Sequence, residues 1–374
     1  MATVVGASPP RSYAAALRAQ DDRGKSSIKV GVITEPTGAH LGAYLSSLAN
    51  CQGVEAIGVA DPTGETFESA QSILGERFGD LRTFHDSGEM IETIKPQLAV
   101  VTLEAHRAPT FIEMALNSGS HVLSEKPACV RQEEFQKLVD VAQLKQRSLM
   151  LALANRLTPP AKKAKEIVQS GLLGKLYGAD LHFIADQTRL TKPAFQQSWQ
   201  AHKAKVGGGH LIWLGIHWLD LIQHISGDRI REVCGFSRNV GGQPIEVEDA
   251  AVLALQFDSG MVGTMQSGYY LDRGYQSHLV LWGSDGWLRF DLVEGASLQW
   301  YSTHENSPKG TQSFSYTLEK REYLPLIQAS VDCARGIERP WITGAEGLHL
   351  LKVIFGLYRA AETGNTQRIA SPGV

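Results

Sequence analysis

The chain has few cysteines, no long apolar run and no marked excess of charge of either sign. Its 374 residues include four cysteines, and no two of them form a Cys-x-x-Cys pair. This spacing argues against a disulfide framework and a structural zinc site, and it favours reduced thiols in a cytoplasmic compartment. No apolar stretch reaches the roughly 18 residues that a membrane-spanning helix needs. We therefore expect a cytoplasmic protein with no membrane partner.

The charge balance also excludes some partners. A formal net charge of -3 at pH 7 provides no basic field for a phosphate backbone, so a small molecule is favoured over nucleic acid. Hydrophobic residues make up 43% of the chain, which is enough for the cores of two domains. Residues 1–27 lack the continuous apolar core of a secretory signal. We interpret them as a disordered tail or a cloning remnant, with an organelle-targeting peptide as the alternative.

Residues 28–153 alternate short β-branched runs with amphipathic stretches. Each strand, helix and strand occupy about thirty residues, a pattern that predicts right-handed parallel crossovers and an α/β domain. Strands are predicted at 28–33, 54–60, 82–84, 98–102, 121–123 and 149–153, and helices at 40–49, 66–75, 87–94, 109–118 and 132–146.

Residues 154–374 follow a different pattern, in which strands are joined by turns. The hairpin signals at 258–260 and 284–286 indicate a mostly antiparallel sheet with helices on one face, an α+β domain that would bind substrate. Strands are predicted at 177–186, 230–237, 250–257, 261–267, 277–283 and 286–291, and helices at 159–170, 209–225, 323–335 and 344–362.

The turn after the first strand is where dinucleotide-binding folds carry Gly-x-Gly-x-x-Gly, because glycines let the backbone approach a pyrophosphate. Here the stretch is Thr34-Glu35-Pro36-Thr37-Gly38-Ala39, which is a weak match. Asp61 ends the second strand, where an acid accepts hydrogen bonds from an adenosine ribose diol, and no neighbouring cation would hold a 2′-phosphate. The pattern favours NAD over NADP. The alternative is that Asp61 only caps a turn and a helix.

The tripeptide Glu125-Lys126-Pro127 carries the strongest chemical signal. It places Lys126 at the carboxyl end of a parallel strand, where open α/β sheets present ligands. A lysine in a partly apolar cleft can donate a proton or a hydrogen bond to a carbonyl or alcohol oxygen. Pro127 permits a cis peptide bond after Lys126. The alternative is a surface lysine paired with Glu125.

The helix predicted at 209–225 would carry several imidazoles on one stripe, with His210, Trp213, His217 and His224 at helical spacing. We expect His217 to transfer a proton, because its ordinary pKa lies near neutrality. His210 either contacts substrate or is a satisfied polar group, and His224 is expected to be structural. His210 and His217 would lie about 10 Å apart along the axis, too far to share one ion, so no metal site is expected.

Several motifs, in their order and spacing, resemble the glucose-fructose oxidoreductase / inositol dehydrogenase / rhizopine-catabolism (Gfo/Idh/MocA) family over residues 28–370. The motifs are Gly-Ser-His-Val-Leu-Ser-Glu-Lys-Pro (119–127), Asn155-Arg156, Ser-Gly-Leu-Leu-Gly-Lys (170–175), Gly-Gly-Gly (207–209) with Gly-Ile-His-Trp-Leu-Asp (215–220), and Val-Glu-Asp (247–249) leading to Phe-Asp-Ser-Gly (257–260). The resemblance implies an N-terminal Rossmann domain and a C-terminal open-faced sheet that often makes homodimers or homotetramers. It also implies NAD(P) and sugar or polyol substrates.

In that family the residues matching Lys126 and His217 are the usual catalytic pair, commonly joined by an aspartate four residues before the histidine. This chain has Trp213 at that position, and an indole offers a sugar ring a flat apolar platform. By the same resemblance, Glu248 and Asp249 begin a strand and are expected to be structural.

Together these observations predict an NAD-dependent oxidoreductase acting on a sugar, glycoside or cyclic polyol. The alternatives are glycoside cleavage by transient oxidation with recycled NAD, and a regulatory or binding protein that has lost the cofactor. The predicted cofactor contacts are Thr34, Pro36, Thr37, Gly38, Ala39, Asp61, Thr102, Glu125 and Lys126. The predicted substrate contacts are Lys126, Asn155, Arg156, His210, Trp213 and His217.

Overall fold

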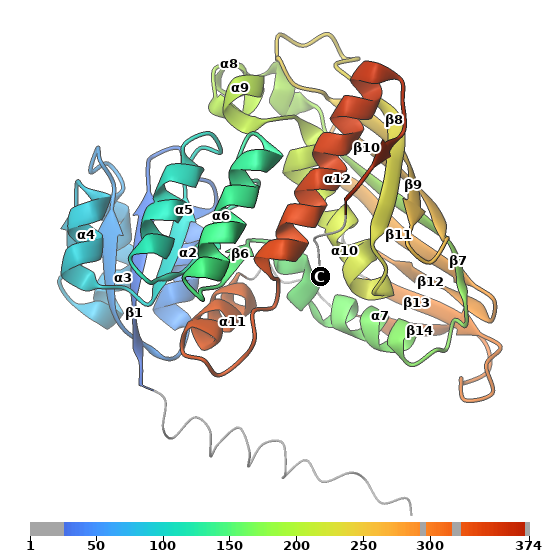
Figure 1. Cartoon of the computed structure of the whole chain (residues 1–374), viewed down its shortest axis with the longest axis horizontal. Helices are drawn as coiled ribbons and strands as arrows, with labels where there is room; N and C mark the ends of the chain where they lie inside the picture. The colour runs from blue at the N-terminus through green and yellow to red at the C-terminus, as the bar shows by residue number, and fades with distance from the viewer. Residues whose placement is uncertain (1–25, 292–296, 316–322, 371–374) are drawn as a thin grey trace, which may run out of the picture.

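Two β-sheets organise the chain, and the computed structural model describes residues 26–291, 297–315 and 323–370 (Figure 1). The predicted N-terminal tail lies almost entirely outside the described residues. Strands of the first sheet all fall between residues 28 and 151, and those of the second begin at residue 176. The change of pattern in the sequence therefore corresponds to a change of sheet.

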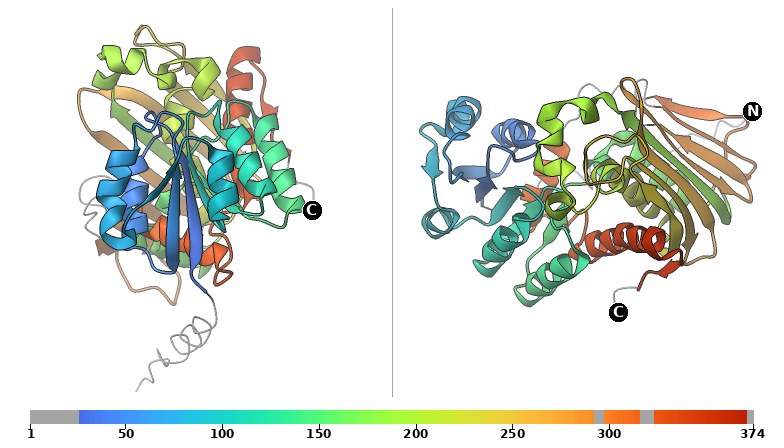
Figure 2. Two further views of the ribbon diagram at one scale, coloured as in Figure 1. Left: turned by 90° about the vertical axis from the view of Figure 1, so that its left-hand side faces the viewer. Right: turned by 90° about the horizontal axis from the view of Figure 1, so that it is seen from above.

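The first sheet is parallel and has the strand order β3-β2-β1-β4-β5-β6. Its strands are β1 (Ile28–Thr34), β2 (Val54–Ala60), β3 (Arg82–Phe84), β4 (Leu98–Thr102), β5 (His121–Ser124) and β6 (Leu149–Leu151). Helices α2 (Leu41–Asn50), α3 (Phe67–Phe78), α4 (Ser87–Ile94), α5 (Ala108–Asn117) and α6 (Gln132–Leu144) flank it on both sides (Figure 2). The order reverses between β1 and β4, which is the switch point where ligands bind in open α/β sheets. The predicted Rossmann fold is confirmed.

The second sheet has nine strands in the order β14-β13-β12-β11-β7-β10-β9-β8-β15. They are β7 (Leu176–Asp186), β8 (Ile230–Arg238), β9 (Ala250–Phe257), β10 (Val262–Leu271), β11 (Tyr275–Gly283), β12 (Gly286–Phe290), β13 (Ser297–Ser302), β14 (Gln312–Ser315) and β15 (Gln367–Arg368). β7 pairs with β10 in parallel, and its other neighbour, β11, pairs with it antiparallel. Both predicted hairpins are present, between β9 and β10 and between β11 and β12.

The sequence did not predict the three strands β13, β14 and β15. β14 reads Gln-Ser-Phe-Ser and β15 has two residues, so neither carries the run of apolar or β-branched residues that identifies a strand. These two strands form the edges of the sheet, where one neighbour is enough to hold them. β14 pairs with the preceding strand β13, whereas β15 pairs with β8, which lies far away in the sequence.

The remaining helices lie on one face of the second sheet or against the first half of the chain. They are α7 (Pro159–Gln169), α8 (Pro193–Gln196), α9 (Lys203–Val206), α10 (Ile216–Ser226), α11 (Leu324–Ala334) and α12 (Gly344–Thr363), with short turns η2 (Ala154–Leu157), η3 (Thr188–Thr191) and η4 (Trp199–Ala201). Helix α12 packs against both α6 and β8, so it lies between the two halves (Figures 1 and 2). The indole of Trp218 on α10 donates to the carbonyl of His278 at 2.8 Å and stacks on Phe183.

A buried ion-pair network ties these helices together. The guanidinium of Arg156, in η2, donates to both oxygens of Asp220 on α10 at 2.7 to 2.9 Å and to Glu346 on α12 at 2.9 Å. Arg156 and Asp220 are buried. Because water cannot compensate either charge there, each depends on the other.

We expect Asp220→Asn to lower the free energy of unfolding by about 3–5 kcal/mol, since it leaves the Arg156 guanidinium buried and incompletely paired. Glu166→Gln is the matched control, because it removes the exposed pair of Glu166 with Lys163 and should change stability by less than about 0.5 kcal/mol. Urea unfolding of both variants measures the difference. Equal losses would contradict the assignment of the Arg156 network as a stabilising element.

Two buried histidines, His210 and His349, and two partly buried ones, His121 and His224, make stability depend on pH. Burial, reinforced by nearby cations, lowers their pKa values to about 4 for His121 and His349 and to about 3 for His210 and His224. The unfolded chain binds these protons near pH 6.5, before the folded chain does. Stability is therefore full above pH 6.5 and falls as the pH drops from 6.5 towards 4.

Replacing His349 with leucine should remove its share of this acid sensitivity. The slope of unfolding free energy against pH between about 6.5 and 4 should decrease by up to about 1.4 kcal/mol per pH unit. Urea titrations at several pH values measure the slope, and His85→Gln, at an exposed position, is the control. An unchanged slope in His349→Leu would contradict the prediction.

Candidate active site

Lys126 lies just beyond the carboxyl end of β5, and its side chain is only 2% exposed. The Lys126–Pro127 peptide bond is cis, as the sequence allowed. The ammonium donates to the backbone carbonyl of Trp213 at 2.6 Å and lies 3.5 Å from the centroid of its ring. A carbonyl oxygen and an indole face both stabilise a cation. Trp213 thus holds the end of β5 against the helical segment of the second domain.

That helical segment begins at the glycine run and is not a uniform α-helix. Its first part, η5 (Leu211–Gly215), is a π-helix, and α10 follows directly. The helix predicted over 209–225 is therefore present, but with a wider first turn. Because π turns change the residue spacing, side chains before and after η5 do not share one α-helical stripe.

Glu248 fixes the start of this segment. Its carboxylate accepts from the backbone amides of Gly209 at 2.5 Å and Leu211 at 3.0 Å, and from the hydroxyl of Tyr358 at 2.9 Å. A Cβ at residue 209 would lie 1.8 Å from the carbonyl oxygen of Glu248, so glycine is required there. Burial raises the pKa of the Glu248 carboxyl, although the hydrogen bonds from these donors act to lower it. The structural role expected for Glu248 agrees with these contacts.

The two histidines of the motif lie in different surroundings. His217 is in the first turn of α10 with 4% exposure, one turn beyond Trp213, whose carbonyl contacts Lys126. His210 is fully buried, its Nδ1 lies 2.6 Å from the hydroxyl of Ser267, and its ring packs edge-on against Tyr269. Burial, and then the charge of Arg189, lowers the pKa of His210 to about 3. His210 is thus a neutral group bonded to β10, while its substrate contact stays a prediction.

Glu125 joins the site to residues that the sequence did not identify. Its Oε2 lies 3.1 Å from Nδ1 of His40 and accepts a hydrogen bond from the hydroxyl of Tyr44. Its Oε1 lies 4.0 Å from the Lys126 ammonium. Burial opposes the charge of this carboxylate, but His40, Lys126 and Tyr44 outweigh it and lower the pKa of Glu125. The ring of His40 stacks parallel to Trp213, with 6.5 Å between centroids. The only sequence signal was the position of His40 directly after the dinucleotide loop.

The loop after β1 packs on the end of β4. The hydroxyl of Thr102 donates to the carbonyl of Ala39 at 2.6 Å, and a Cβ at Gly38 would lie 2.5 Å from the carbonyl oxygen of Thr102. The helix that follows, α2, has no side-chain cap and no acid in its first turn. Its amides therefore remain suited to an anion, such as a pyrophosphate, at the switch point. These features fit a dinucleotide despite the altered glycine pattern.

Other predicted cofactor residues lie around this loop. Thr34, at the end of β1, is buried and its hydroxyl lies 3.3 Å from the carbonyl oxygen of Thr102. The carbonyl of Thr37 accepts from the Trp199 indole at 3.4 Å, a contact between the two halves of the chain. Pro36 precedes Thr37 in the same turn.

Asp61 is buried at the end of β2, and its carboxylate is hydrogen-bonded within its own turn. One oxygen accepts from the amide and hydroxyl of Thr63, and the other from those of Thr66, all at 2.9 to 3.0 Å. Burial alone would raise the pKa of Asp61, but these four donors lower it. The structure thus shows the capping role that the sequence left open, and the ribose contact stays a prediction.

Asn155 and Arg156 were predicted to contact substrate. The Arg156 guanidinium is engaged by Asp220 and Glu346, as described above, and both predicted residues are buried. The amide nitrogen of Asn155 has no hydrogen-bond partner among the described residues. Of the two, Asn155 is the one that retains a donor for a ligand.

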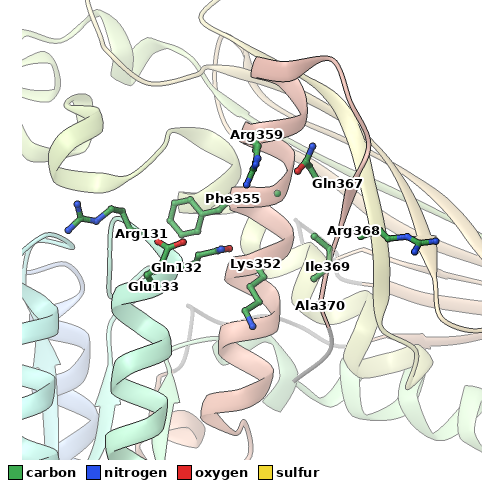
Figure 3. Close-up of a pocket in the computed structure, with 11 residues that line it drawn as sticks. Arg131, Gln132, Glu133, Lys352, Phe355, Arg359, Gln367, Arg368, Ile369 and Ala370 are labelled. Atoms are coloured by element: carbon green, nitrogen blue, oxygen red, sulfur yellow. The ribbon is translucent and has the colours of Figure 1, made fainter. Parts of the chain in front are cut away.

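A cavity of about 460 Å³ lies elsewhere, between α6, α12 and β15 (Figure 3). None of the predicted site residues lines it. Arg131 and Arg368 extend away from it in opposite directions and pair with Glu134 and Glu232. The cavity is therefore not a continuation of the site around Lys126.

Within the described ranges, no cluster of three or more His, Cys, Asp or Glu side chains has a geometry that could hold a metal ion. None of the described helices is both long and apolar enough to cross a membrane. All four cysteines are described and are free thiols, as the sequence predicted.

Comparison with known proteins adds independent information. Residues 29–153 match the model of an oxidoreductase family with an NAD-binding Rossmann fold, and residues 161–289 match the Gfo/Idh/MocA C-terminal domain. Myo-inositol 2-dehydrogenase of Thermotoga maritima is 22% identical over 294 residues, which cover 77% of this chain and 84% of that protein. D-glucoside 3-dehydrogenase of Escherichia coli K12 is 23% identical over 315 residues, which cover 79% and 86%.

A solved structure shows the same architecture. The WlbA dehydrogenase from Bordetella pertussis, crystallised with NADH and UDP-GlcNAcA, matches with a TM-score of 0.77 at 19% identity, covering 92% of this chain and 98% of that one. At this identity the match demonstrates the fold alone. With the two family models spanning both halves of the chain, the protein belongs to the Gfo/Idh/MocA family of NAD-binding oxidoreductases.

Proposed function

We propose that this oxidoreductase transfers a hydride between NAD and a hydroxyl or keto carbon of a sugar, glycoside or cyclic polyol, with Lys126 and His217 in proton transfer. The observation that carries the proposal is the position of Lys126. Its buried ammonium contacts the carbonyl of Trp213, one turn before His217. This brings the end of a Rossmann strand to the helix that bears the second proton-transfer group. The named relatives act on an inositol and on a D-glucoside, which supports the substrate class.

NAD, when bound, would supply the hydride acceptor or donor, and the protein handles the charge on oxygen. The Lys126 ammonium donates a hydrogen bond to the reacting oxygen and stabilises its developing negative charge. His217 takes the hydroxyl proton during oxidation and returns it during reduction. The Trp213 ring lies against the Lys126 ammonium and offers an apolar face to a sugar ring.

The residues around the switch point would hold the dinucleotide. The first-turn amides of α2 would meet the pyrophosphate, with Thr37, Gly38 and Ala39 in the preceding loop. NAD is favoured over NADP because Asp61 would repel a 2′-phosphate. The family's C-terminal sheet and the free thiols lead us to propose, in addition, a homodimer or homotetramer in the cytoplasm.

Replacing Lys126 with methionine, or His217 with glutamine, should lower kcat by about 100-fold or more, because each variant removes a proton-transfer group. NADH formation is followed at 340 nm with NAD and a panel of myo-inositol, methyl glucosides and free aldoses. Gln187→Ala, a substitution in a loop that follows β7, is the control and should retain turnover. Full turnover by both Lys126→Met and His217→Gln would refute the proposed roles.

The same assay separates the alternative reactions. A dehydrogenase accumulates NADH in proportion to the oxidised sugar. Redox-assisted cleavage would instead release p-nitrophenol from p-nitrophenyl glucosides without net NADH, and NAD would be recovered with the purified protein. A protein that neither contains nor binds NAD or NADP would have lost the cofactor site.

NAD should bind at least about tenfold more tightly than NADP, since charge repulsion by a carboxylate near the ribose opposes a 2′-phosphate. Asp61→Asn should reduce this preference and also lower the unfolding temperature, because the turn into α3 loses charged hydrogen bonds. Calorimetric titration with each nucleotide and a thermal melt measure the two effects. A lower melting temperature with an unchanged nucleotide preference would assign Asp61 to capping alone.

A further inference from the structure

We propose that Glu125 and His40 form a proton relay that connects the buried Lys126 ammonium to solvent. The inference rests on the proposed function and deepens it. Oxidation of an alcohol releases one proton for each hydride transferred, and that proton must leave the site. Lys126 is 2% exposed, so it exchanges protons slowly unless neighbouring groups carry them.

Three side chains form a continuous line from the interior outward. Lys126 and Glu125 are 2% and 3% exposed, whereas His40 is 28% exposed. Glu125 directs one carboxylate oxygen towards each neighbour: Oε2 lies 3.1 Å from Nδ1 of His40, and Oε1 lies 4.0 Å from Nζ of Lys126. Exposure to solvent is therefore low at Lys126 and Glu125 and much higher at the His40 imidazole.

The inner oxygen of Glu125 is free to receive a proton. Oε1 is buried and has no hydrogen-bond partner among the described residues. A buried carboxylate oxygen without a donor is costly, and the nearest cation, Lys126, is 4.0 Å away. A movement of the ammonium by about 1 Å brings the two atoms within hydrogen-bond distance. The unsatisfied oxygen thus faces the only group from which the relay would take a proton.

The backbone of His40 also points to a role for its side chain. His40 has φ +60°, a left-handed conformation that glycine adopts with least strain. The residue is the N-cap of α2, and its ring contacts the rings of Tyr44, Trp213 and Tyr323. Tyr44 also donates to Oε2 of Glu125. The titratable groups that face the relay are therefore Lys126, Tyr44 and Tyr323.

The transfer conserves protons and needs no further reactant. During oxidation the Lys126 ammonium gives a proton to Glu125, Glu125 passes a proton to Nδ1 of His40, and His40 releases one from Nε2 to water. The neutral Lys126 amine then takes a proton from the site, either from the substrate hydroxyl or from His217. In reduction each proton moves in the opposite direction. No bond other than N–H and O–H forms or breaks in the relay.

The relay predicts that His40→Ala lowers kcat about tenfold or more in dilute buffer, and that added imidazole restores it in a concentration-dependent way. Glu125→Gln should show the same loss without rescue, since imidazole does not replace the inner carboxylate. The substrate is the compound of the panel above that gives the wild type its highest turnover. NAD affinity, measured by titration, should stay within about twofold in His40→Ala, because binding does not require proton exchange.

His106→Ala is the matched control, because His106 is also partly exposed and lies 3.5 Å from a carboxylate, that of Glu104. Its kcat should not respond to imidazole. A wild-type kcat in His40→Ala across pH 6 to 9 in dilute buffer would overturn the relay, as would a loss that imidazole does not restore. Full turnover by Lys126→Met and His217→Gln, or no turnover of any panel compound by the wild type, would instead refute the proposed function and the relay with it.

Discussion

Burial of the Lys126 ammonium is the constraint on which the site depends. A charge removed from water must be compensated by the protein, or it neutralises. Here the compensation comes from both halves of the chain. Trp213 provides a carbonyl oxygen and a ring face, and Glu125 provides a nearby carboxylate. The two halves therefore meet at this lysine, which couples the position of β5 to that of the helix bearing His217.

Other buried polar groups maintain the geometry of that helix. Glu248 holds the amides at its start, and the wide π turn that follows sets the direction of α10. Asp220, later in α10, is anchored by Arg156. Two buried carboxylates thus hold this segment, Glu248 at its start and Asp220 within α10. Such pairing fixes a unique arrangement, because alternative packings would leave a buried charge unpaired.

The site around Glu125 differs from the family pattern, yet its charged groups still have contacts that compensate their charge. The family resemblance places an aspartate where this chain has Trp213, so one carboxylate beside the proposed pair of Lys126 and His217 is replaced by an indole. The indole still contacts the ammonium, through its ring and its carbonyl. It also stacks on His40, whose Nδ1 lies 3.1 Å from Oε2 of Glu125. Aromatic rings therefore enclose the Lys126 and Glu125 pair and reduce its contact with water.

The sequence by itself determined the two sheets, the boundaries of most helices, and the Lys126 and His217 motifs. Hydrophobic periodicity and turn residues are local signals, and they are strong in β4 and in the two hairpins. The tertiary structure alone decided which partners the polar groups have. Asp61 bonds to Thr63 and Thr66, Arg156 to Asp220 and Glu346, and His40 to Glu125. The sequence does not show which donors will surround a carboxylate. Of these partners, Arg156 and Glu346 are 190 residues apart, and such partners meet only when the sheets and helices have packed.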